Sequence, residues 1–250
     1  MERQLPLLLT ALCITFSGIV SAQESGFSVG AGVGSGESPY KDYSNDATWL
    51  PYISLENGNF YVRGLSAGYT LYDAEKQQLS IELSYKPEAF DPSDSSDSQM
   101  KLLDERKETY LGAIKYRYRM GLVDWFTAAS ADLSDRSDEV SVNAGVAINL
   151  PFSERIYIRP AMGVEWMNAS GIDYLYGISN VESVRSGLAT YHPGSTTQPF
   201  ASLMARFALT KQLALSLNGR VIYLSDEVKE SPMVDKSTSY NVSAFIVYKY

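Results

Sequence analysis

The side chains that most often carry enzyme chemistry are scarce in this chain. His192 is the only histidine, and Ser186 and Ser195 lie near it in the sequence. A histidine activates a serine hydroxyl only when it lies within hydrogen-bond reach and a third group orients it. The pair Pro193-Gly194, which follows His192, is a turn signal. We therefore interpret His192 as a loop residue and predict that the protein is not an enzyme; a lipid-modifying enzyme centred on His192 is the alternative.

Sequence motifs for bound ligands are incomplete as well. Acidic residues are frequent between positions 88 and 108, but the Asp-x-Asp-x-Asp-Gly frame of a calcium loop is absent. We therefore interpret this segment as a solvated acidic loop. The alternating glycines of residues 30–36 lack the lysine and the following helix of a phosphate-binding loop. The sequence has no cysteine–histidine cluster for a transition metal. We expect no catalytic residue, no cofactor and no metal site.

The C-terminal segment shows the dominant pattern of the sequence. From Tyr240 to Tyr250 every second residue is apolar or aromatic, and the residues between them are mixed. A period of two places each set on one face of a β-strand. Such a strand would be an aggregation-prone edge in a soluble protein, whereas it closes the wall of a membrane barrel. We expect Tyr248 and Tyr250 to form the C-terminal signal for the barrel-insertion machinery.

The same alternation recurs along the chain and predicts an all-β fold, a transmembrane antiparallel β-barrel of the outer-membrane type with about twelve strands. Short connections alternate with long polar ones, as in such barrels. Residues 59–72 form either two short strands or one long one, and 172–180 is a possible extra hairpin, so the range is about ten to fourteen strands. The predicted strands span residues 27–34, 48–56, 59–64, 65–72, 77–86, 108–119, 122–133, 138–149, 155–168, 198–209, 212–224 and 239–250.

The mixed faces of these strands carry charges of both signs. On a lipid-facing surface each Lys or Arg would cost about 2–4 kcal/mol near the bilayer midplane, so we place these side chains inside the barrel. There they either fill and stiffen the interior or line a path for a solute. The charges assigned to the interior are Glu82, Lys115, Arg117, Arg119, Asp132, Arg155, Arg159, Glu165, Arg206 and Arg220.

The N-terminus and the composition agree with export. A short polar opening with Arg3, an apolar stretch over residues 5–20 and the small residues before position 23 predict a signal peptide over residues 1–22, cleaved after Ala22. Residues 23–250 then form one barrel domain. Cys13, the only cysteine, lies inside the signal peptide, so no disulfide is expected. The formal net charge of −8 argues against a nucleic-acid partner.

Four segments together resemble one family. Residues 173–182 resemble a Tyr-Tyr-Gly-Val-Ser block, 186–194 a Ser-Gly-Leu-Pro-x-Tyr-x-Pro-Gly block, 230–235 a Ser-Pro-hydrophobic-Val element and 102–107 a Leu-x-Asp-Arg-Lys stretch. Their order and spacing are similar to those of the MipA/OmpV family, the MltA-interacting outer-membrane proteins. Two positions depart from the pattern, because Ala189 replaces a proline and Tyr250 replaces the more frequent terminal Phe. The family-like loop positions are Tyr174, Tyr176, Gly177, Ser186, Gly187, Tyr191, Pro193, Gly194, Ser231 and Pro232.

The resemblance implies an outer-membrane location and a role without catalysis. The family's namesake is described as a scaffold that joins a lytic murein transglycosylase to a penicillin-binding protein, so these enzymes are the expected protein partners. Outer-membrane lipid and lipopolysaccharide are further expected partners. Weak divalent bridging to lipopolysaccharide phosphates is the alternative to a merely solvated acidic loop. The family brings no catalytic residues with it. A narrow solute channel is the alternative to the scaffold.

Overall fold

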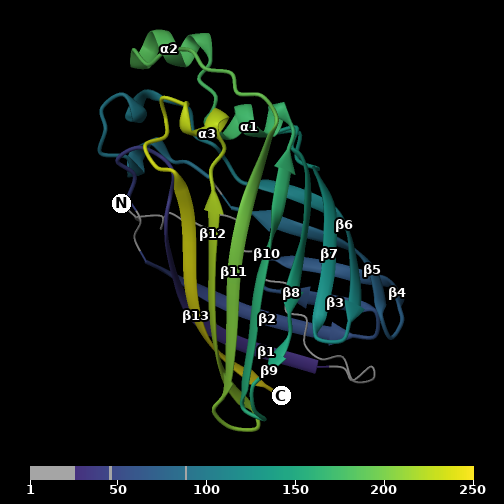
Figure 1. The fold of residues 1–250 in the computed structure, drawn as a ribbon. Coiled ribbons are helices and arrows are strands. Elements are labelled where there is room, and N and C mark those ends of the chain that lie inside the picture. Colours follow the sequence, from purple (N-terminus) through teal and green to yellow (C-terminus); the bar gives the residue numbers. More distant parts are fainter. Residues whose placement is uncertain (1–25, 45–46, 88) are drawn as a thin grey trace.

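The computed structural model describes residues 26–44, 47–87 and 89–250. The expected signal peptide, its cleavage site at Ala22 and Cys13 lie outside these ranges. The described residues form a closed antiparallel β-barrel with short helices at one end (Figure 1). In this part of the chain, no helix has the length and apolarity needed to cross a membrane.

Twelve strands make the wall, as the alternation predicts. β8 and β9 both pair with β10 and act as one strand that is interrupted at Asn149. β10 also pairs with β11, and this pairing closes the ring. The strands are β1 (Gly26–Glu37), β2 (Thr48–Asn57), β3 (Phe60–Arg63), β4 (Ser66–Asp73), β5 (Gln77–Lys86), β6 (Thr109–Met120), β7 (Val123–Asp132), β8 (Val140–Ile148), β9 (Leu150–Pro151), β10 (Ile156–Met167), β11 (Thr196–Ala208), β12 (Leu213–Tyr223) and β13 (Thr238–Lys249).

Side chains alternate between the outside and the inside of the wall. Along β2, Trp49 and Ile53 are exposed, whereas Leu50 and Tyr52 are buried and pack inside against Phe245 of β13. This period of two is the pattern of a sheet whose outer face meets an apolar medium. The exposed row of large apolar side chains is therefore the expected lipid-facing surface.

The β3–β4 hairpin is short, so the height of the wall differs around the barrel. Gly64, which has φ 57°, turns the chain after only four residues of β3, and this divides 59–72 into two strands. Residues 54–57 of β2 pair with β3, whereas residues 48–52 pair with β1 alone. Pro51 lies in this one-sided stretch, where a residue without an N–H donor is tolerated. Pro160 likewise faces the interruption between β8 and β9.

The two ends of the barrel differ. The short turns 58–59, 74–76, 121–122, 152–155 and 209–212 lie at the end where the chain terminates, which we call the short-turn end. At the other end, residues 38–44, 89–108, 168–195 and 224–237 gather into a folded unit, which we call the cap. It contains α1 (Ala169–Tyr176), α2 (Asn180–Ser186), α3 (Asp226–Lys229) and the 3₁₀ turns η1 (Pro92–Asp94) and η2 (Met100–Leu102).

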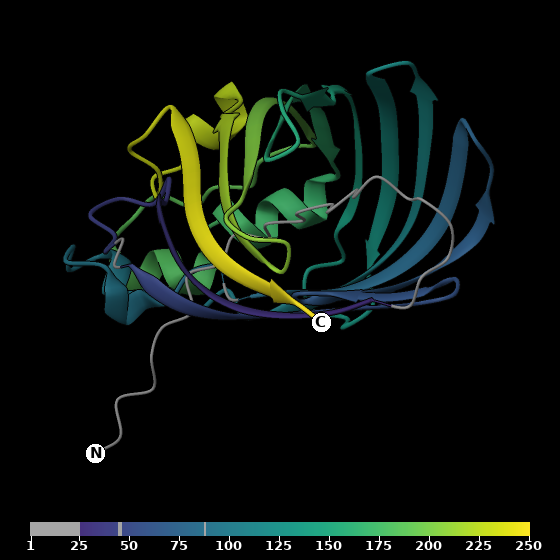
Figure 2. The ribbon, with the colours of Figure 1, turned by 90° about the horizontal axis from the view of Figure 1, so that it is seen from below.

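The structure excludes one of the sequence alternatives for the long loops. Residues 172–176 belong to α1, residues 177–179 link it to α2, and α2 begins at Asn180, so this segment forms no extra hairpin. The acidic segment 89–108 is folded rather than merely solvated, since Phe90 and Met100 are fully buried in the cap. Seen from the short-turn end, α1 appears through the ring of strands (Figure 2). Because Figure 1 places α1 at the opposite end, the helix stands over that mouth of the barrel.

Candidate functional site: the cap and the charged interior

The cap has its own apolar core, which is built from all four long connections. Tyr40 and Tyr43 come from the β1–β2 connection, Phe90 from β5–β6, Ile178 from β10–β11 and Met233 from β12–β13. The Tyr40 and Phe90 rings lie 4.9 Å apart between centroids, a distance typical of favourable aromatic pairs. A shared core of this kind makes the four connections one folded unit.

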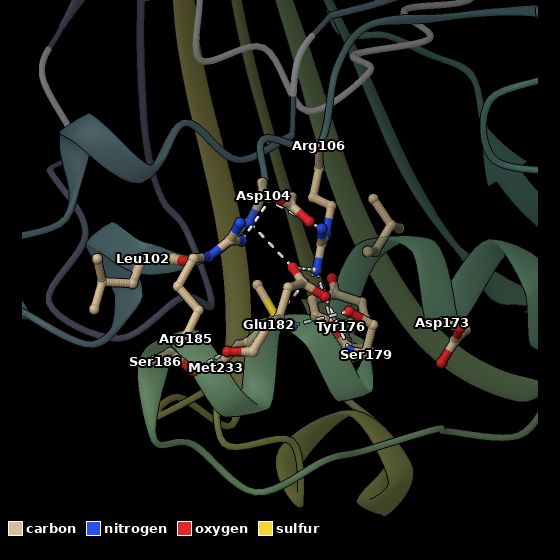
Figure 3. A network of polar contacts seen from close by, with 12 residues as sticks. Leu102, Asp104, Arg106, Asp173, Tyr176, Ser179, Glu182, Arg185, Ser186 and Met233 are labelled. Carbon is tan, nitrogen blue, oxygen red and sulfur yellow. Dashed lines mark hydrogen bonds and ion pairs between the residues drawn. The ribbon is translucent and has the colours of Figure 1, made fainter.

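Arg106 joins three of these connections at the centre of the cap (Figure 3). Its Nη2 donates to the Gly177 carbonyl and to Glu182 Oε1, both at 2.9 Å, and Met233 Sδ lies 4.0 Å away. The side chains of Arg106 and Glu182 are 9% and 4% exposed. Glu182 also accepts from the backbone N–H groups of Asp104 and Ser179. The buried charges are therefore hydrogen-bonded as well as paired, which is what makes their burial tolerable.

Backbone contacts complete the links between the connections. The Tyr40 hydroxyl donates to the Leu175 carbonyl at 3.0 Å, and the Lys41 N–H donates to the Met233 carbonyl at 2.8 Å. The Ser231 hydroxyl donates to the Tyr176 carbonyl at 2.6 Å. Each of these bonds satisfies a carbonyl in a connection other than the donor's own.

Local sequence signals explain why helices form in the connection 168–195. Asn168 and Ser179 cap the N-termini of α1 and α2, and Ser179 with Glu182 forms a reciprocal capping box. Gly187 ends α2 with φ 77°, a left-handed conformation that suits glycine. The Ser-x-x-Glu spacing is visible in the sequence, and it is the signal that would have predicted α2.

The structure brings most of the family-like loop positions into structural contacts within the cap. The Tyr174 hydroxyl donates to the Lys107 carbonyl at 3.1 Å, and the Tyr191 hydroxyl donates to the Glu227 carbonyl at 2.7 Å. The Ser186 hydroxyl donates to the Glu182 carbonyl at 2.7 Å. Pro193 is buried, whereas Gly194 is exposed. The motif thus marks residues that hold the cap together.

The environment of the cap shifts several pKa values in agreement with these contacts. Burial raises the pKa of Tyr40 and of Tyr176 well above the ordinary value. Burial would also raise the pKa of Glu182, but hydrogen bonds from Ser179 and Asp104 and the charge of Arg106 outweigh it, so the pKa is lowered. At neutral pH both tyrosines are neutral and Glu182 is an anion.

His192 is part of an exposed pair at the surface of the cap. Its Nδ1 lies 2.9 Å from Asp173 Oδ1, and the two side chains are 60% and 42% exposed. The hydroxyl of Ser186 is engaged within α2 and accepts from the Leu188 N–H. His192 has no contact with Ser186 among the bonds of the described residues, and no group of three possible metal ligands occurs there.

Inside the barrel, charged side chains from neighbouring strands form ion pairs. Lys115 Nζ lies 3.0 Å from Glu82 Oε2, which also accepts from the Tyr61 hydroxyl at 3.0 Å. Arg220 Nη2 lies 2.9 Å from Glu165 Oε2. These pairs cross from one strand to another, so they stiffen the interior as well as neutralise it.

One further interior pair was not among the charges assigned from the sequence. Lys86 Nζ lies 2.5 Å from Glu139 Oε2, and the Glu139 side chain is 3% exposed. The alternation places both residues on the mixed faces of their strands, so the signal for this pair was present in the sequence.

At the short-turn end the interior carries more positive than negative charge. Arg119 Nε donates to Asp124 Oδ1 at 2.9 Å, and Arg159 Nη2 lies 3.7 Å from Asp124 Oδ2. Arg117 donates to the neutral Gln78 at 2.9 Å. Arg206 lies near this end as well, close to the end of β11, whereas Arg155 is exposed in the turn 152–155. No ion pair joins either arginine to the described residues.

A pair of glycines shapes the middle of the interior. Gly145 and Gly163 lie opposite each other in the ladder between β8 and β10. A Cβ atom on Gly145 would lie 2.7 Å from the Phe126 ring, and one on Gly163 would lie 2.8 Å from the Phe200 ring. The guanidinium of Arg220 lies 4.0 Å above the Phe200 ring. The glycines thus leave the space that two aromatic rings occupy.

Comparisons with known proteins identify relatives that match most of the chain. The model of the family described as "MltA-interacting protein MipA" matches residues 29–250. The MltA-interacting protein of Escherichia coli K12 is 36% identical over 99% of both chains, and the putative outer membrane protein YiaT of the same strain is 34% identical over 93% of this chain and 94% of its own. Among solved structures, the translocator domain of the autotransporter NalP from Neisseria meningitidis has the same type of fold (TM-score 0.50, 12% identity, 91% and 89% coverage).

Proposed function

Because the chain belongs to the MltA-interacting protein MipA family of outer-membrane β-barrels, we propose that it acts without catalysis as a scaffold for murein-remodelling enzymes. The observation that carries this proposal is the similarity to the MltA-interacting protein of Escherichia coli, which extends over 99% of both chains. A lytic transglycosylase and a penicillin-binding protein are the proposed partners. A scaffold needs a surface rather than a reaction centre, and the site residues described above hold structure together.

The short-turn end is the proposed docking side. Barrels of this class place their short turns in the periplasm, where murein lies. The turns at this end carry exposed apolar side chains: Met120 is 57% exposed, Leu122 53% and Phe152 77%. The Asn149 N–H donates to the Leu122 carbonyl, so the turns that hold Leu122 and Phe152 are neighbours on the rim. An apolar rim of this kind suits contact with another protein.

Affinity capture from envelopes tests the scaffold. The tagged full-length chain is expressed in a Gram-negative host, extracted in mild detergent and captured, and the bound proteins are identified by mass spectrometry. We expect a lytic transglycosylase to be recovered above an untagged control. The paired changes Leu122→Ser and Phe152→Ser should reduce this recovery at least severalfold.

A matched control lies on the opposite end of the barrel. Val184 of α2 is 89% exposed on the cap, so Val184→Ser removes a similar apolar side chain far from the short turns. This variant should recover the enzyme as the parent does. Capture of no murein enzyme by the parent would refute the scaffold, and equal loss in both variants would refute the docking side.

Further proposals concern the export of the chain and its membrane surroundings. We infer that residues 1–22 are removed after Ala22, that Tyr248 and Tyr250 are read by the insertion machinery, and that the apolar outer face binds membrane lipid. We also infer that lipopolysaccharide surrounds the cap end. Mass spectrometry of the purified mature chain tests the cleavage, because the N-terminal residue should be Gln23.

A narrow solute channel is the second candidate function. The observation that favours it is the charged interior, where arginines at the short-turn end outnumber the carboxylates that pair with them. Single-channel recordings in planar bilayers test it. Discrete ion-selective conductance steps would support a path through the barrel, and a silent bilayer with protein inserted would refute it.

A further inference from the structure

Three arginines surround one carboxylate inside the barrel at the short-turn end. Arg119 is the next-to-last residue of β6, and Asp124, the second residue of β7, lies opposite it in the ladder. Arg119 donates to Asp124 Oδ1 at 2.9 Å, and Arg159 of β10 approaches Asp124 Oδ2 to 3.7 Å. Arg117 precedes Arg119 by two residues, so it projects from the same face of β6.

Small residues on the intervening strand leave room for this group. Ala147 of β8 lies between Asp124 of β7 and Ala161 of β10 in the ladder, and it is fully buried. A larger side chain at this position would stand between Asp124 and Arg159. The methyl group of Ala147 instead lets the guanidinium of Arg159 reach over the strand towards Asp124.

The arginines of this group have hydrogen-bond donors that no residue of the group occupies. The Arg159 side chain is only 10% exposed, and its Nε is buried without a hydrogen-bond partner among the described residues. Asp124 Oδ2 lies 3.7 Å from Arg159 Nη2, too far for a hydrogen bond, so Asp124 leaves the donors of this guanidinium partly free. Arg117 has the neutral Gln78 as its hydrogen-bond partner. Buried charges normally find partners, because an unpaired one is costly.

The excess of positive charge and the exposure of Arg119 to solvent both favour an anionic ligand. The other nearby carboxylate is Asp73, which is exposed and accepts from Gln78 Nε2 at 3.3 Å. Three guanidinium groups therefore face one buried and one peripheral carboxylate. The Arg119 side chain is 34% exposed, so the group is open to solvent. Arg206, opposite Tyr157 in the ladder between β10 and β11, adds a further positive charge near the same end.

We propose that Arg117, Arg119 and Arg159 form a binding site for a small oxyanion, a phosphate or carboxylate group, at the short-turn end of the barrel interior. The planar guanidinium presents paired N–H donors that match the geometry of such oxygens. The bound anion takes the unused donor of Arg159 and balances the excess charge, while Asp124 holds Arg119 and Arg159 in place. The site is independent of the scaffold role, which concerns the outer surface of the turns.

Calorimetric titration of the purified barrel tests this site. The probes are inorganic phosphate, acetate and glucose 6-phosphate at low ionic strength, since salt screens such contacts. We expect saturable binding of phosphate, and Arg119→Gln should weaken it about tenfold or more, as the loss of a charge-assisted hydrogen bond does. Binding of acetate as well would define a general oxyanion site, and binding of glucose 6-phosphate would extend it to phosphorylated solutes.

Two further variants keep the test falsifiable. Arg185→Gln removes an arginine that pairs with Asp104 at the surface of the cap, and it should leave phosphate affinity unchanged. Asp124→Asn keeps an oxygen that accepts from Arg119 Nε, so the arginines stay in place, but it removes the negative charge that repels an anion. It should therefore raise the affinity severalfold, an effect opposite in sign to that of Arg119→Gln. Heat-modifiable mobility on gels verifies that each variant is folded. Absence of phosphate binding by the parent, or equal affinity in Arg119→Gln, would overturn the proposal.

Discussion

Arg106 and Glu182 are separated by 76 residues in the sequence, yet an ion pair of 2.9 Å joins them in the interior of the cap. Each partner also binds the backbone of the other's connection, through the Gly177 carbonyl and the Asp104 N–H. The pair therefore couples the β5–β6 connection to the β10–β11 connection. Its loss should affect the cap and leave the barrel wall intact, because neither residue belongs to a strand.

Removal of the Arg106 charge tests this coupling. Arg106→Met leaves the Glu182 carboxylate buried without its partner, a change that destabilises by about 3–5 kcal/mol. We expect proteolysis within residues 89–108 to become much faster, while heat-modifiable mobility of the barrel persists. The matched control is Arg185→Met at the exposed pair with Asp104, where the loss should be at most about 1 kcal/mol. Equal protease resistance of parent and Arg106→Met would contradict the prediction.

The cap should also loosen in acid. The pKa of Glu182 is lowered below its ordinary value of 4.5, so the folded cap favours the ionised carboxylate. This contribution is complete above pH 4.5 and is lost as the pH falls through the lowered pKa. Asp97, whose pKa is lowered by its hydrogen bond with Lys41, acts with the same sign. Near-ultraviolet circular dichroism of the packed tyrosines, recorded from pH 7 to pH 3, should show the loss.

Glu182→Gln is the reference variant for the acid transition. It should be less stable at pH 7, because it lacks the charge that pairs with Arg106, and its signal should change less with pH. A parent protein whose tyrosine signal is constant down to pH 3 would show that Glu182 does not control the cap.

The paired glycines inside the barrel predict a site that is sensitive to a single methyl group. Gly145→Ala places a Cβ 2.4 Å from the Met162 carbonyl oxygen and 2.7 Å from the Phe126 ring, so backbone and ring must both move. We expect a loss of about 1–3 kcal/mol, measured from urea unfolding of the barrel in lipid or detergent. Gly219→Ala in β12 is the control, because its Cβ meets no atom closer than 3.7 Å. Similar unfolding midpoints for both variants would refute this account.

The C-terminal residue offers a test of barrel assembly. The Tyr250 N–H donates to the Phe27 carbonyl at 3.0 Å, and the two rings lie 5.5 Å apart, so the last residue secures the seam between β13 and β1. Tyr250→Phe keeps the ring and restores the more frequent terminal residue, so it should assemble at least as well as the parent. Tyr250→Asp should lower the heat-modifiable fraction severalfold. Normal assembly of Tyr250→Asp would argue against any role of this residue.

The alternation of apolar and polar residues was sufficient to predict the strands of the barrel wall, but it did not predict the folded cap. A strand between lipid and interior must repeat every two residues, so the signal is local and strong, and most strand ends lie within a few residues of the prediction. The ambiguous segment 59–72 depended on one turn at Gly64, which periodicity does not encode. Helix α2 is too short for a helical period, although Ser179 and Glu182 carried its capping signal.

Contacts between distant segments could not be predicted from one sequence. The core of the cap joins Tyr40, Phe90, Ile178 and Met233 from four connections, and no local pattern specifies which loops fold together. In the interior, alternation assigns a face to a residue such as Arg159 but does not name its partner. The grouping of three arginines around Asp124 depends on ladder register, which only the structure provides.

Because β3 is short, one edge of β2 is left unpaired near the cap end of the barrel. Residues 48–52 of β2 pair with β1 but not with β3. This edge of β2 therefore lacks the ladder hydrogen bonds that join neighbouring strands elsewhere in the wall. Segments with fewer ladder hydrogen bonds open at lower free energy, so we expect amide hydrogen exchange to be fastest along this edge of β2. The four-residue length of β3 therefore determines where local opening of the wall is expected to begin.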